Sequence, residues 1–367
     1  MNFGERAKAV TRQFLMPKVA YEVFGSNVLA AREVGNGKKG RGYQVEKAVK
    51  YQSSNTAESI SHMDTFQAVQ LETKFRLNVQ MKAAHQSIGI SGFELIANQD
   101  SEVRVTDLLT ETLEESQDEL FDKVGDFVYN DGTGNSSKDP NGLGYIVDDG
   151  TNAPTYQGQS RSTYSVLNST VTSLSGVGGE LTLARLATLY SNISSGTGMT
   201  TPTLMISGET EWDLYEQLLT PTVRETYSSM GYYSVSKDSR GTVRGGSHEG
   251  LSGKAGFVAL SYKGVPYCRD EKAGEHASGS IYMLNENKLD WFGWQNRQLD
   301  YESLSFRHTT VETTFAERPM SEFTGFSWKP FISAQNQFAG ISDIMIVGNM
   351  GSWEPRRHGV LTNVDEV

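Results

Sequence analysis

The sequence is poor in cysteine and in long apolar runs, and both shortages exclude classes of protein. Cys268 is the single cysteine, so the chain has no internal disulfide framework and no cysteine-rich zinc site. No stretch approaches the roughly 18 consecutive apolar residues of a membrane-spanning helix. Residues 1–16 carry Arg6, Lys8 and Arg12 but no unbroken apolar core, so they do not form a secretory signal.

Apolar residues are also scarce overall. They make up 37% of the chain, whereas about 45–50% is usual for soluble domains. The 16 Tyr and 16 Phe residues compensate in part, because each aromatic side chain buries a large area. We therefore expect a folded chain of one large domain or two to three smaller ones, with an unusual share of its surface in contact with other subunits.

Catalytic and cofactor-binding motifs are missing as well. The six histidines lie too far apart in the sequence for a helical zinc pair, and no GxSxG nucleophile motif occurs. Gly253-Lys254 is followed by Ala255 and does not complete a phosphate-binding loop. Cys268 ends an apolar strand pattern, which predicts a buried structural thiol. Asp148 and Asp149 lie in a glycine-flanked turn and are expected to be solvated. The sequence thus predicts no enzyme, catalytic residue, cofactor or metal site.

Charge is spread unevenly along the chain. Residues 1–50 hold ten Lys and Arg against four Asp and Glu, a net charge of +6, and the whole chain carries −11. The other 317 residues therefore carry −17. A basic arm on an acidic body can dock on a neighbour's acidic surface, remain solvated or bind nucleic acid, but the acidic body argues against extended phosphate binding.

What is present is an alternation over 69–82 in which every odd residue is apolar or Thr and every even residue is polar or charged, the pattern of a strand with one buried face. A strand of this length would extend roughly 46 Å, more than twice the usual length, and suggests contact with neighbouring molecules. Residues 43–51 alternate too, and a polar Ser/Asn-rich segment separates the two. The sequence therefore predicts an extended β-hairpin.

A long acidic helix is predicted next, over 102–130. Its apolar stripe consists of Leu109, Leu113, Leu120, Val124 and Phe127/Val128, and nine acids occupy its other faces. A Gly-rich turn at 131–144 follows and leads into a mixed α/β region. The chain then shows an alternating segment at 301–315 and a short apolar strand at 341–347.

This order of elements resembles the major capsid protein of tailed bacteriophages, the Hong Kong ninety-seven type fold. The local sequences that carry the resemblance are Ile90-Ser91-Gly92-Phe93-Glu94, Gly132-Thr133-Gly134 with Gly142-Leu143-Gly144, Tyr156 to Arg161, and Val347 to Met350 with Glu354-Pro355. The resemblance covers nearly the whole chain and depends on the order of elements, because the individual motifs are short and degenerate.

The resemblance implies an α+β fold with four parts. They are an N-terminal arm (1–35), an extended β-hairpin loop (36–80), a peripheral domain (81–140 and 300–340) with the spine helix 102–130, and an axial domain (141–299 and 341–367). Candidate assembly contacts are Lys38, Lys39, Arg41, Tyr43, Val69, Leu71, Phe75 and Leu77. Lys47, Lys50 and Asn349 match the residue types of the Lys–Asn cross-link that some relatives form between subunits.

The function that the resemblance implies is structural. Copies of the chain would assemble as hexamers and pentamers into the icosahedral head of a phage, in the virion and, during assembly, in the bacterial cytoplasm. Other partners would be scaffolding, portal and decoration proteins, and double-stranded DNA held without sequence-specific contacts; no membrane is involved. Many relatives carry an N-terminal scaffolding segment, whereas here the hairpin begins by residue 43, so a separate scaffold or a missing upstream part is expected.

Three other functions fit parts of the sequence. An encapsulin-type nanocompartment shell shares the fold, although the long 36–80 hairpin favours the phage. A surface adhesin or carbohydrate-binding protein could stack sugar on Trp291, Trp294, Trp328 and Trp353, although such rings are more often packed in a core or interface. A metal-dependent hydrolase could use Asp148, Asp149 and a histidine, and it would be stabilised thermally by its metal.

Overall fold

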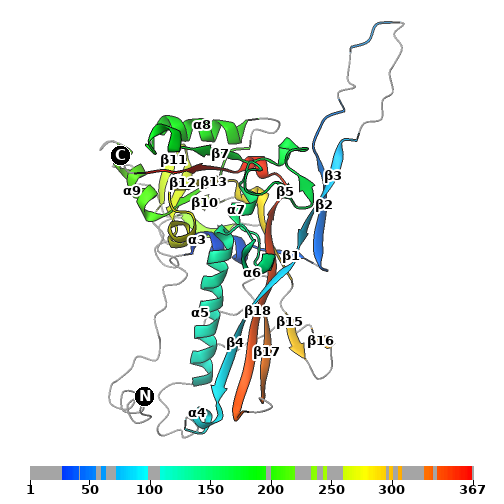
Figure 1. The fold of residues 1–367 in the computed structure, drawn as a ribbon, viewed down its shortest axis with the longest axis vertical. Coiled ribbons are helices and arrows are strands. Elements are labelled where there is room, and N and C mark those ends of the chain that lie inside the picture. The colour runs from blue at the N-terminus through cyan, green and yellow to red at the C-terminus, as the bar shows by residue number, and fades with distance from the viewer. Residues whose placement is uncertain are drawn as a thin grey trace.

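The chain forms an elongated molecule in the computed structural model (Figure 1). A compact body lies at one end, a limb runs from it along the long axis, and a hairpin projects from the side of the body (Figure 1). The structure describes residues 27–40, 42–54, 59–62, 72–97, 108–195, 200–219, 233–237, 243–245, 259–294, 297–300, 305–307, 326–333 and 337–365.

The hairpin consists of β2 (Gln44–Lys50) and β3 (Lys74–Gln80), which pair antiparallel along their whole length. Phe75, Leu77 and Val79 of β3 are buried, and the residues between them are exposed or half-buried. This alternation is what a strand with one covered face requires. The predicted hairpin is therefore confirmed.

The predicted single strand over 69–82 is wrong in its extent. The strand β3 begins at Lys74, and a second strand, β4 (Lys82–Ser91), begins just after Met81. At Met81 the chain leaves the hairpin and enters a different sheet. The buried positions change parity there, from odd-numbered in β3 to even-numbered in β4, so the single alternating strand ends at this point.

The limb and the body share a seven-stranded sheet built around β18 (Ala339–Ser352), a strand of 14 residues. It pairs antiparallel with β4, with β17 (Phe326–Ser333) and with β14 (Leu289–Trp294). The predicted apolar strand 341–347 is thus confirmed, and it extends on both sides. The remaining strands of this sheet are β1 (Lys38–Gly40), β15 (Arg297–Asp300) and β16 (Ser305–Arg307).

The helix α5 (Leu108–Tyr129) lies along the limb beside β4 and β18 (Figure 1). Leu120, Val124 and Val128 on one of its faces are buried, at the spacing of successive helical turns. Exposed acids such as Glu115 and Glu119 lie on the other side. The predicted long helix is therefore confirmed over 108–129, and residues 102–107 lie outside the described part. Its assignment as the spine of a peripheral domain stays a prediction.

The body contains a six-stranded sheet with the strand order β11-β12-β8-β13-β19-β7. Its core includes Leu186 and Leu189 of α8 (Leu183–Ser194) and Trp212 and Tyr215 of α9 (Glu209–Leu218). The mixed α/β prediction for this region is confirmed. The strands are β7 (Thr170–Ser173), β8 (Leu204–Ser207), β11 (Ala259–Tyr262), β12 (Val265–Arg269), β13 (Ile281–Leu284) and β19 (Gly359–Thr362).

Short elements complete the described residues. The helical ones are α4 (Gly92–Ala97), α6 (Gly134–Ser137), α7 (Leu143–Ile146), α11 (Glu271–His276), η1 (Ser165–Leu167), η2 (Ser175–Val177), η4 (Glu286–Lys288) and η6 (Pro355–Arg357). The strands are β5 (Thr155–Tyr156) paired with β6 (Gln159–Ser160), and β9 (Tyr233–Lys237) paired with β10 (Val243–Gly245). No helix in the described ranges combines the length and the apolar character needed to cross a membrane.

The helix α3 (Val28–Gly35), the first in the described residues, is packed into its own chain. Val28, Leu29 and Val34 are buried in the core that also contains residues of α5 and β14. The last part of the predicted N-terminal arm therefore belongs to the subunit's own core, while residues 1–26 lie outside the described part. The predicted boundary between 340 and 341 falls inside β18, so one continuous strand joins the two predicted domains.

Candidate assembly interface

The hairpin has one face toward the body and one face toward solvent. Directly paired residues of antiparallel strands point to the same side, so the pairs of β2 and β3 divide into two sets. The pairs on the covered face are Val45 with Val79, Lys47 with Leu77, and Val49 with Phe75. The pairs on the outer face are Gln44 with Gln80, Glu46 with Asn78, Ala48 with Arg76, and Lys50 with Lys74.

The covered face contacts residues of the same chain. The Phe75 ring lies 4.6 Å from Tyr164 and 5.4 Å from Tyr51 between centroids, and Lys47 Nζ lies 5.6 Å from the centre of the Trp353 ring. Leu77 is fully buried in the core. These contacts hold the base of the hairpin to the body.

The outer face of the hairpin is basic and exposed. Lys50, Lys74 and Arg76 lie on it, and Glu46 is the single acid among the four outer pairs. An ion pair joins Arg76 Nη1 to Glu46 Oε2 at 3.8 Å, and both side chains remain largely open to solvent. Such an exposed pair contributes little to stability, about 0–1 kcal/mol. With three basic residues against one acid, the outer face carries a net positive charge.

The predicted assembly contacts fall into three groups. Tyr43 is 87% exposed and Lys39 is also exposed, so both can reach a neighbouring molecule. The Lys38 side chain is exposed, but it forms an ion pair within its own chain, with Nζ 2.7 Å from Asp290 Oδ2. Phe75 and Leu77 contact the chain's own core, as described above, and Arg41, Val69 and Leu71 lie outside the described residues. A role in assembly therefore stays a prediction, and only the exposed residues, such as Tyr43 and Lys39, are accessible to a neighbouring molecule.

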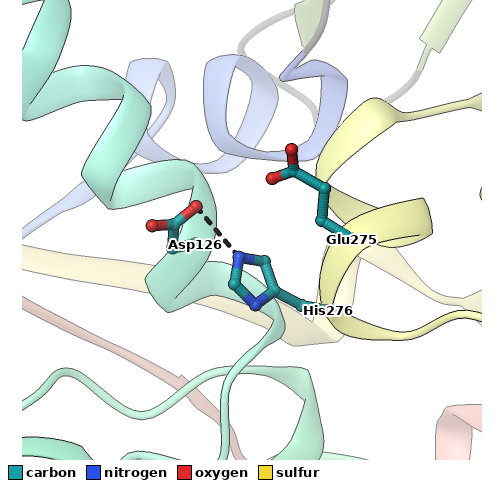
Figure 2. A group of neighbouring side chains, drawn as sticks. All are labelled: Asp126, Glu275 and His276. Atoms are coloured by element: carbon teal, nitrogen blue, oxygen red, sulfur yellow. Dashed lines mark hydrogen bonds and ion pairs between the residues drawn. The ribbon is translucent and has the colours of Figure 1, made fainter.

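A group of charged side chains joins the limb to the body, and sequence reasoning did not find it. Figure 2 shows Asp126 of α5 pointing toward His276 of α11, with Glu275 beside them. His276 Nε2 lies 3.0 Å from Asp126 Oδ1, and Lys272 Nζ lies 3.0 Å from Asp122, Asp126 and Glu275. The Lys272 ammonium lies among these three carboxylates and pairs with each of them, so the group acts as an ionic brace between α5 and α11.

The charges of this brace are stabilised by one another. Burial alone would raise the pKa of Asp126, but hydrogen bonds from Lys123, Lys272 and His276 outweigh it and lower the pKa to about 2. Burial likewise opposes the charge of Lys272, whereas Asp126, Glu275 and Asp122 raise its pKa. Asp126 and Lys272 therefore remain charged throughout the neutral range.

Asp270 connects α3 to the body. Its carboxylate is buried and accepts hydrogen bonds from Leu29 N in the first turn of α3 and from Lys272 N in the first turn of α11, each at 3.0 Å. One side chain thus caps two helices. Burial raises the pKa of Asp270 to about 6. An aspartate before a helix is a common N-cap, so the position of Asp270 is consistent with the start of α11. Nothing in the sequence indicates that Asp270 also binds α3.

His358 is a fully buried histidine that bonds through both ring nitrogens. Its Nδ1 accepts from Asn285 N at 3.3 Å, which leaves Nε2 to donate to Ser352 Oγ at 3.0 Å. Burial lowers the pKa of His358 to about 3. The neutral ring is therefore a structural link between β13, β18 and β19.

Two predicted side-chain environments can be compared directly with the structure. Cys268 is buried, and burial raises the pKa of its thiol to about 12, so the predicted structural thiol is confirmed. The prediction that Asp148 is solvated is wrong. Its carboxylate is buried and accepts from Gly150 N at 2.8 Å and from Ala153 N at 2.9 Å, because it closes its own turn.

The remaining candidates from the sequence are also mostly buried. Asn349 is fully buried, with Oδ1 accepting from Asn141 N and Nδ2 donating to Gln80 O, so a cross-link to another subunit cannot reach it in this conformation. Trp291 and Trp353 are buried and offer no platform for sugar stacking. The side chain of Trp328 lies outside the described part.

The fold was compared with known proteins. No family model and no curated protein matches the sequence. Among solved structures, the cyanophage A-1(L) capsid asymmetric unit matches with a TM-score of 0.64 at 12% identity, over 97% of each chain. The capsid of Myoviridae phage XM1 matches with a TM-score of 0.51 at 12% identity, over 99% of this chain and 98% of that one.

A related match is the holo-SrpI encapsulin complex from Synechococcus elongatus PCC 7942. Its TM-score is 0.55 at 10% identity, over 98% of this chain and 95% of that one. At such identities the likeness concerns the fold, and it extends from end to end of the chain in each of the three structures. The chain has the fold of tailed-phage major capsid proteins, as its sequence predicts.

Proposed function

We propose that the chain is the major capsid protein of a tailed phage, and that its copies assemble as hexamers and pentamers into an icosahedral shell around double-stranded DNA. The observation that carries this proposal is the end-to-end match to the cyanophage capsid chain, with a TM-score of 0.64. The shape of the subunit supports it, because the limb and the hairpin extend away from the body in different directions (Figure 1).

The hairpin supplies a physical reason for assembly. A two-stranded sheet is at best marginally stable in water, and here the body contacts the hairpin on its covered face and along the free edge of β3, while the outer face stays largely exposed. Contact with a second copy would cover more of it, and in a closed symmetric shell the same contact would recur in every subunit. The exposed Tyr43 and Lys39 are the residues that we expect in this contact.

Charge is consistent with a container for DNA. The 317 residues after the basic N-terminal segment carry −17, and α5 exposes acids along the limb. A predominantly acidic surface repels phosphate, so the shell would hold DNA without sequence-specific contacts. Scaffolding, portal and decoration proteins would be its other partners. The protein would occur in the virion, and in the bacterial cytoplasm while heads assemble.

An encapsulin-type shell is the second candidate, favoured by the TM-score of 0.55 to the SrpI complex. Such a shell would enclose protein instead of DNA. The projecting hairpin and the higher TM-score to the cyanophage capsid favour the phage head. Particles that copurify with a protein cargo and no nucleic acid would reverse this preference.

Negative-stain electron microscopy of the purified full-length chain tests the proposal. The chain is expressed alone and, if it stays monomeric, together with neighbouring genes from its locus. Closed shells or rings of five and six subunits are the expected result, and the shell diameter separates a phage head from a small nanocompartment. A folded monomer that never assembles under either condition would contradict both shell functions.

A further inference from the structure

A short turn of the body touches the base of the hairpin and has an unusual backbone. The strands β5 and β6 are joined by Gln157 and Gly158, whose φ angles are 47° and 85°. Tight hairpin turns of this kind need positive φ at both central residues, which glycine and asparagine adopt readily and glutamine does not. Gln157 therefore holds a costly conformation, and such strain points to a role for the turn.

The turn binds the edge of β3 that does not pair with β2. Asn78 N donates to Gln157 O at 3.3 Å, and Gln159 Nε2 donates to Arg76 O at 3.0 Å. A Cβ at Gly158 would lie 3.3 Å from the Oδ1 atom of the Asn78 side chain, so the glycine leaves room for this side chain of β3 against the turn. The free backbone edge of β3 thus forms hydrogen bonds to the body at two residues, Arg76 and Asn78.

The turn is itself fixed in the body. Gln157 N donates to Tyr145 Oη at 2.6 Å. The fully buried Tyr156 donates from its hydroxyl to Ser352 O at 2.8 Å and accepts from Ser352 N at 3.0 Å. These partners lie in α7 and at the end of β18, so the turn cannot shift without breaking these hydrogen bonds.

A second contact comes from the same loop and acts on a different side of the hairpin. Tyr164 N donates to Ser160 O at 3.0 Å, and the Tyr164 ring packs against Phe75 and, edge-on at 5.0 Å, against Tyr51. The turn therefore grips the edge of β3, while Tyr164 supports the covered face. Together they restrain movement of the hairpin in the plane of its two strands and movement toward or away from the body.

We propose that residues 155–164 form a bracket that sets the direction in which the hairpin leaves the body, before any neighbour is bound. Gln159 and Tyr164 are its positioning residues. A preset direction lowers the entropy that a second copy must overcome when it binds the hairpin. This last consequence rests on the proposed shell function, whereas the restraint itself is a property of the single chain.

The restraint is measured on the full-length monomer by electron-electron distances between two spin labels. Lys50→Cys places one label on the hairpin and Lys138→Cys places the other on an exposed turn of the body. The buried Cys268 should not react in the folded chain, and the unsubstituted protein controls for it. The test variants are Gln159→Ala and the double variant Gln159→Ala with Tyr164→Ala. Gln44→Ala is the matched control, because its side chain bonds only within the hairpin, to Glu46.

The bracket predicts a narrow distance distribution in the parent and in Gln44→Ala, a broader one in Gln159→Ala, and at least a twofold broader one in the double variant. Gln159→Lys restores a hydrogen-bond donor near Arg76 O, so its distance distribution should be narrower than that of Gln159→Ala. Far-UV circular dichroism checks that each variant is folded. Equal widths in all folded variants, or a broad distribution in the parent, would overturn the proposal.

Assembly is scored separately on the same variants by electron microscopy. If the parent forms shells, the bracket variants should give fewer closed shells and a wider spread of diameters than Gln44→Ala. Unchanged shells from variants with a loosened hairpin would overturn the link to assembly. If the parent forms no shells, the proposed function fails, and the label distances still decide whether the bracket exists.

Discussion

Two buried side chains, Asp270 and His358, make stability depend on pH in opposite directions. The raised pKa of Asp270, about 6, means that the folded state favours the protonated acid. Its contribution is full below the unfolded pKa, near 3.8, and is lost as the pH rises through about 6. The lowered pKa of His358, about 3, means that the folded state favours the neutral ring. That contribution is full above 6.5 and is lost as the pH falls toward 3.

Replacing His358 with Gln should remove part of the chain's acid sensitivity. Each pH unit below 6.5 costs the folded wild type up to about 1.4 kcal/mol through His358, and this cost disappears with the imidazole. Urea unfolding at pH 7 and pH 5 measures the difference. We expect His358→Gln to be less stable than wild type at pH 7, by about 1–3 kcal/mol, because buried hydrogen bonds are lost. The gap should narrow at pH 5.

His62→Gln is the control for this experiment, because His62 is exposed. It should follow the wild-type curve at both pH values. A constant difference between His358→Gln and wild type from pH 7 to pH 5 would contradict the neutral, buried state assigned to His358.

At the scale of elements, β18 joins the limb to the body, and Gly348 is the point where its partners change. Gly348 pairs with Lys82 of β4 and with Gly293 of β14. A side chain at Gly348 would lie 2.6 Å from atoms of the Trp291 ring, which is itself buried. The indole therefore fills the space above the strand at this junction, and the backbone there must carry no Cβ.

Gly348→Ala should destabilise the chain by about 1–3 kcal/mol, because the added methyl group overpacks the core against Trp291. Gly89→Ala is the matched control. Gly89 also lies in a strand of the same sheet, and a Cβ there would meet no atom within 4 Å. The midpoint of thermal unfolding should fall for the first variant and stay equal or rise slightly for the second. Equal midpoints would show that the indole moves aside at little cost.

The sequence was sufficient to predict elements with a clear period and could not show how they pair. The helix over 108–129 and the hairpin strands follow from apolar spacing alone. The change of sheet at Met81 coincides with a change of phase, because the buried positions are odd-numbered in β3 and even-numbered in β4, but the period alone does not identify the new partner strand. The length of β18 was underestimated, because polar residues such as Asn349 and Ser352 are buried in its second half.

The candidate site was predicted less well, for a different reason. A buried apolar residue in a hairpin can face a neighbour or its own body, and the sequence pattern is the same in both cases. Phe75 and Leu77 face their own body. The brace of Lys272 with Asp126 and the contact of Gln159 with Arg76 both join residues remote in sequence, which periodicity does not relate.

On the scale of the whole molecule, exposed basic and acidic residues lie on different elements. The outer face of the hairpin carries Lys50, Lys74 and Arg76, whereas α5 exposes Glu115 and Glu119 along the limb. Figure 1 shows the hairpin projecting from the side of the body and α5 running along the limb, so the two sets of charges lie on different parts of the molecule. Two copies that bring the hairpin of one near the limb of the other would gain from this separation.

Lys74→Glu should slow assembly severalfold in dilute buffer without changing the stability of the monomer beyond about 0.5 kcal/mol, because Lys74 is exposed. Light scattering follows assembly, and its rate for the wild type should fall when salt is raised, since ions screen exposed charges beyond roughly 10 Å at 0.1 M. Lys138→Glu, on an exposed turn of the body, makes the same charge change away from the hairpin. An equal effect of both substitutions would indicate a response to net charge alone.

The pairing of β18 with β4 also gives the limb a mechanical property. Residues Ala339 to Gly348 pair in an unbroken run with Ser91 to Lys82, and the hydrogen bonds of an antiparallel pair lie across the strand direction. Tension applied at the tip along the strands would load the whole run in shear at once, instead of peeling one bond after another. The limb would therefore resist stretching and would transmit tension through Gly348 and β14 to the body.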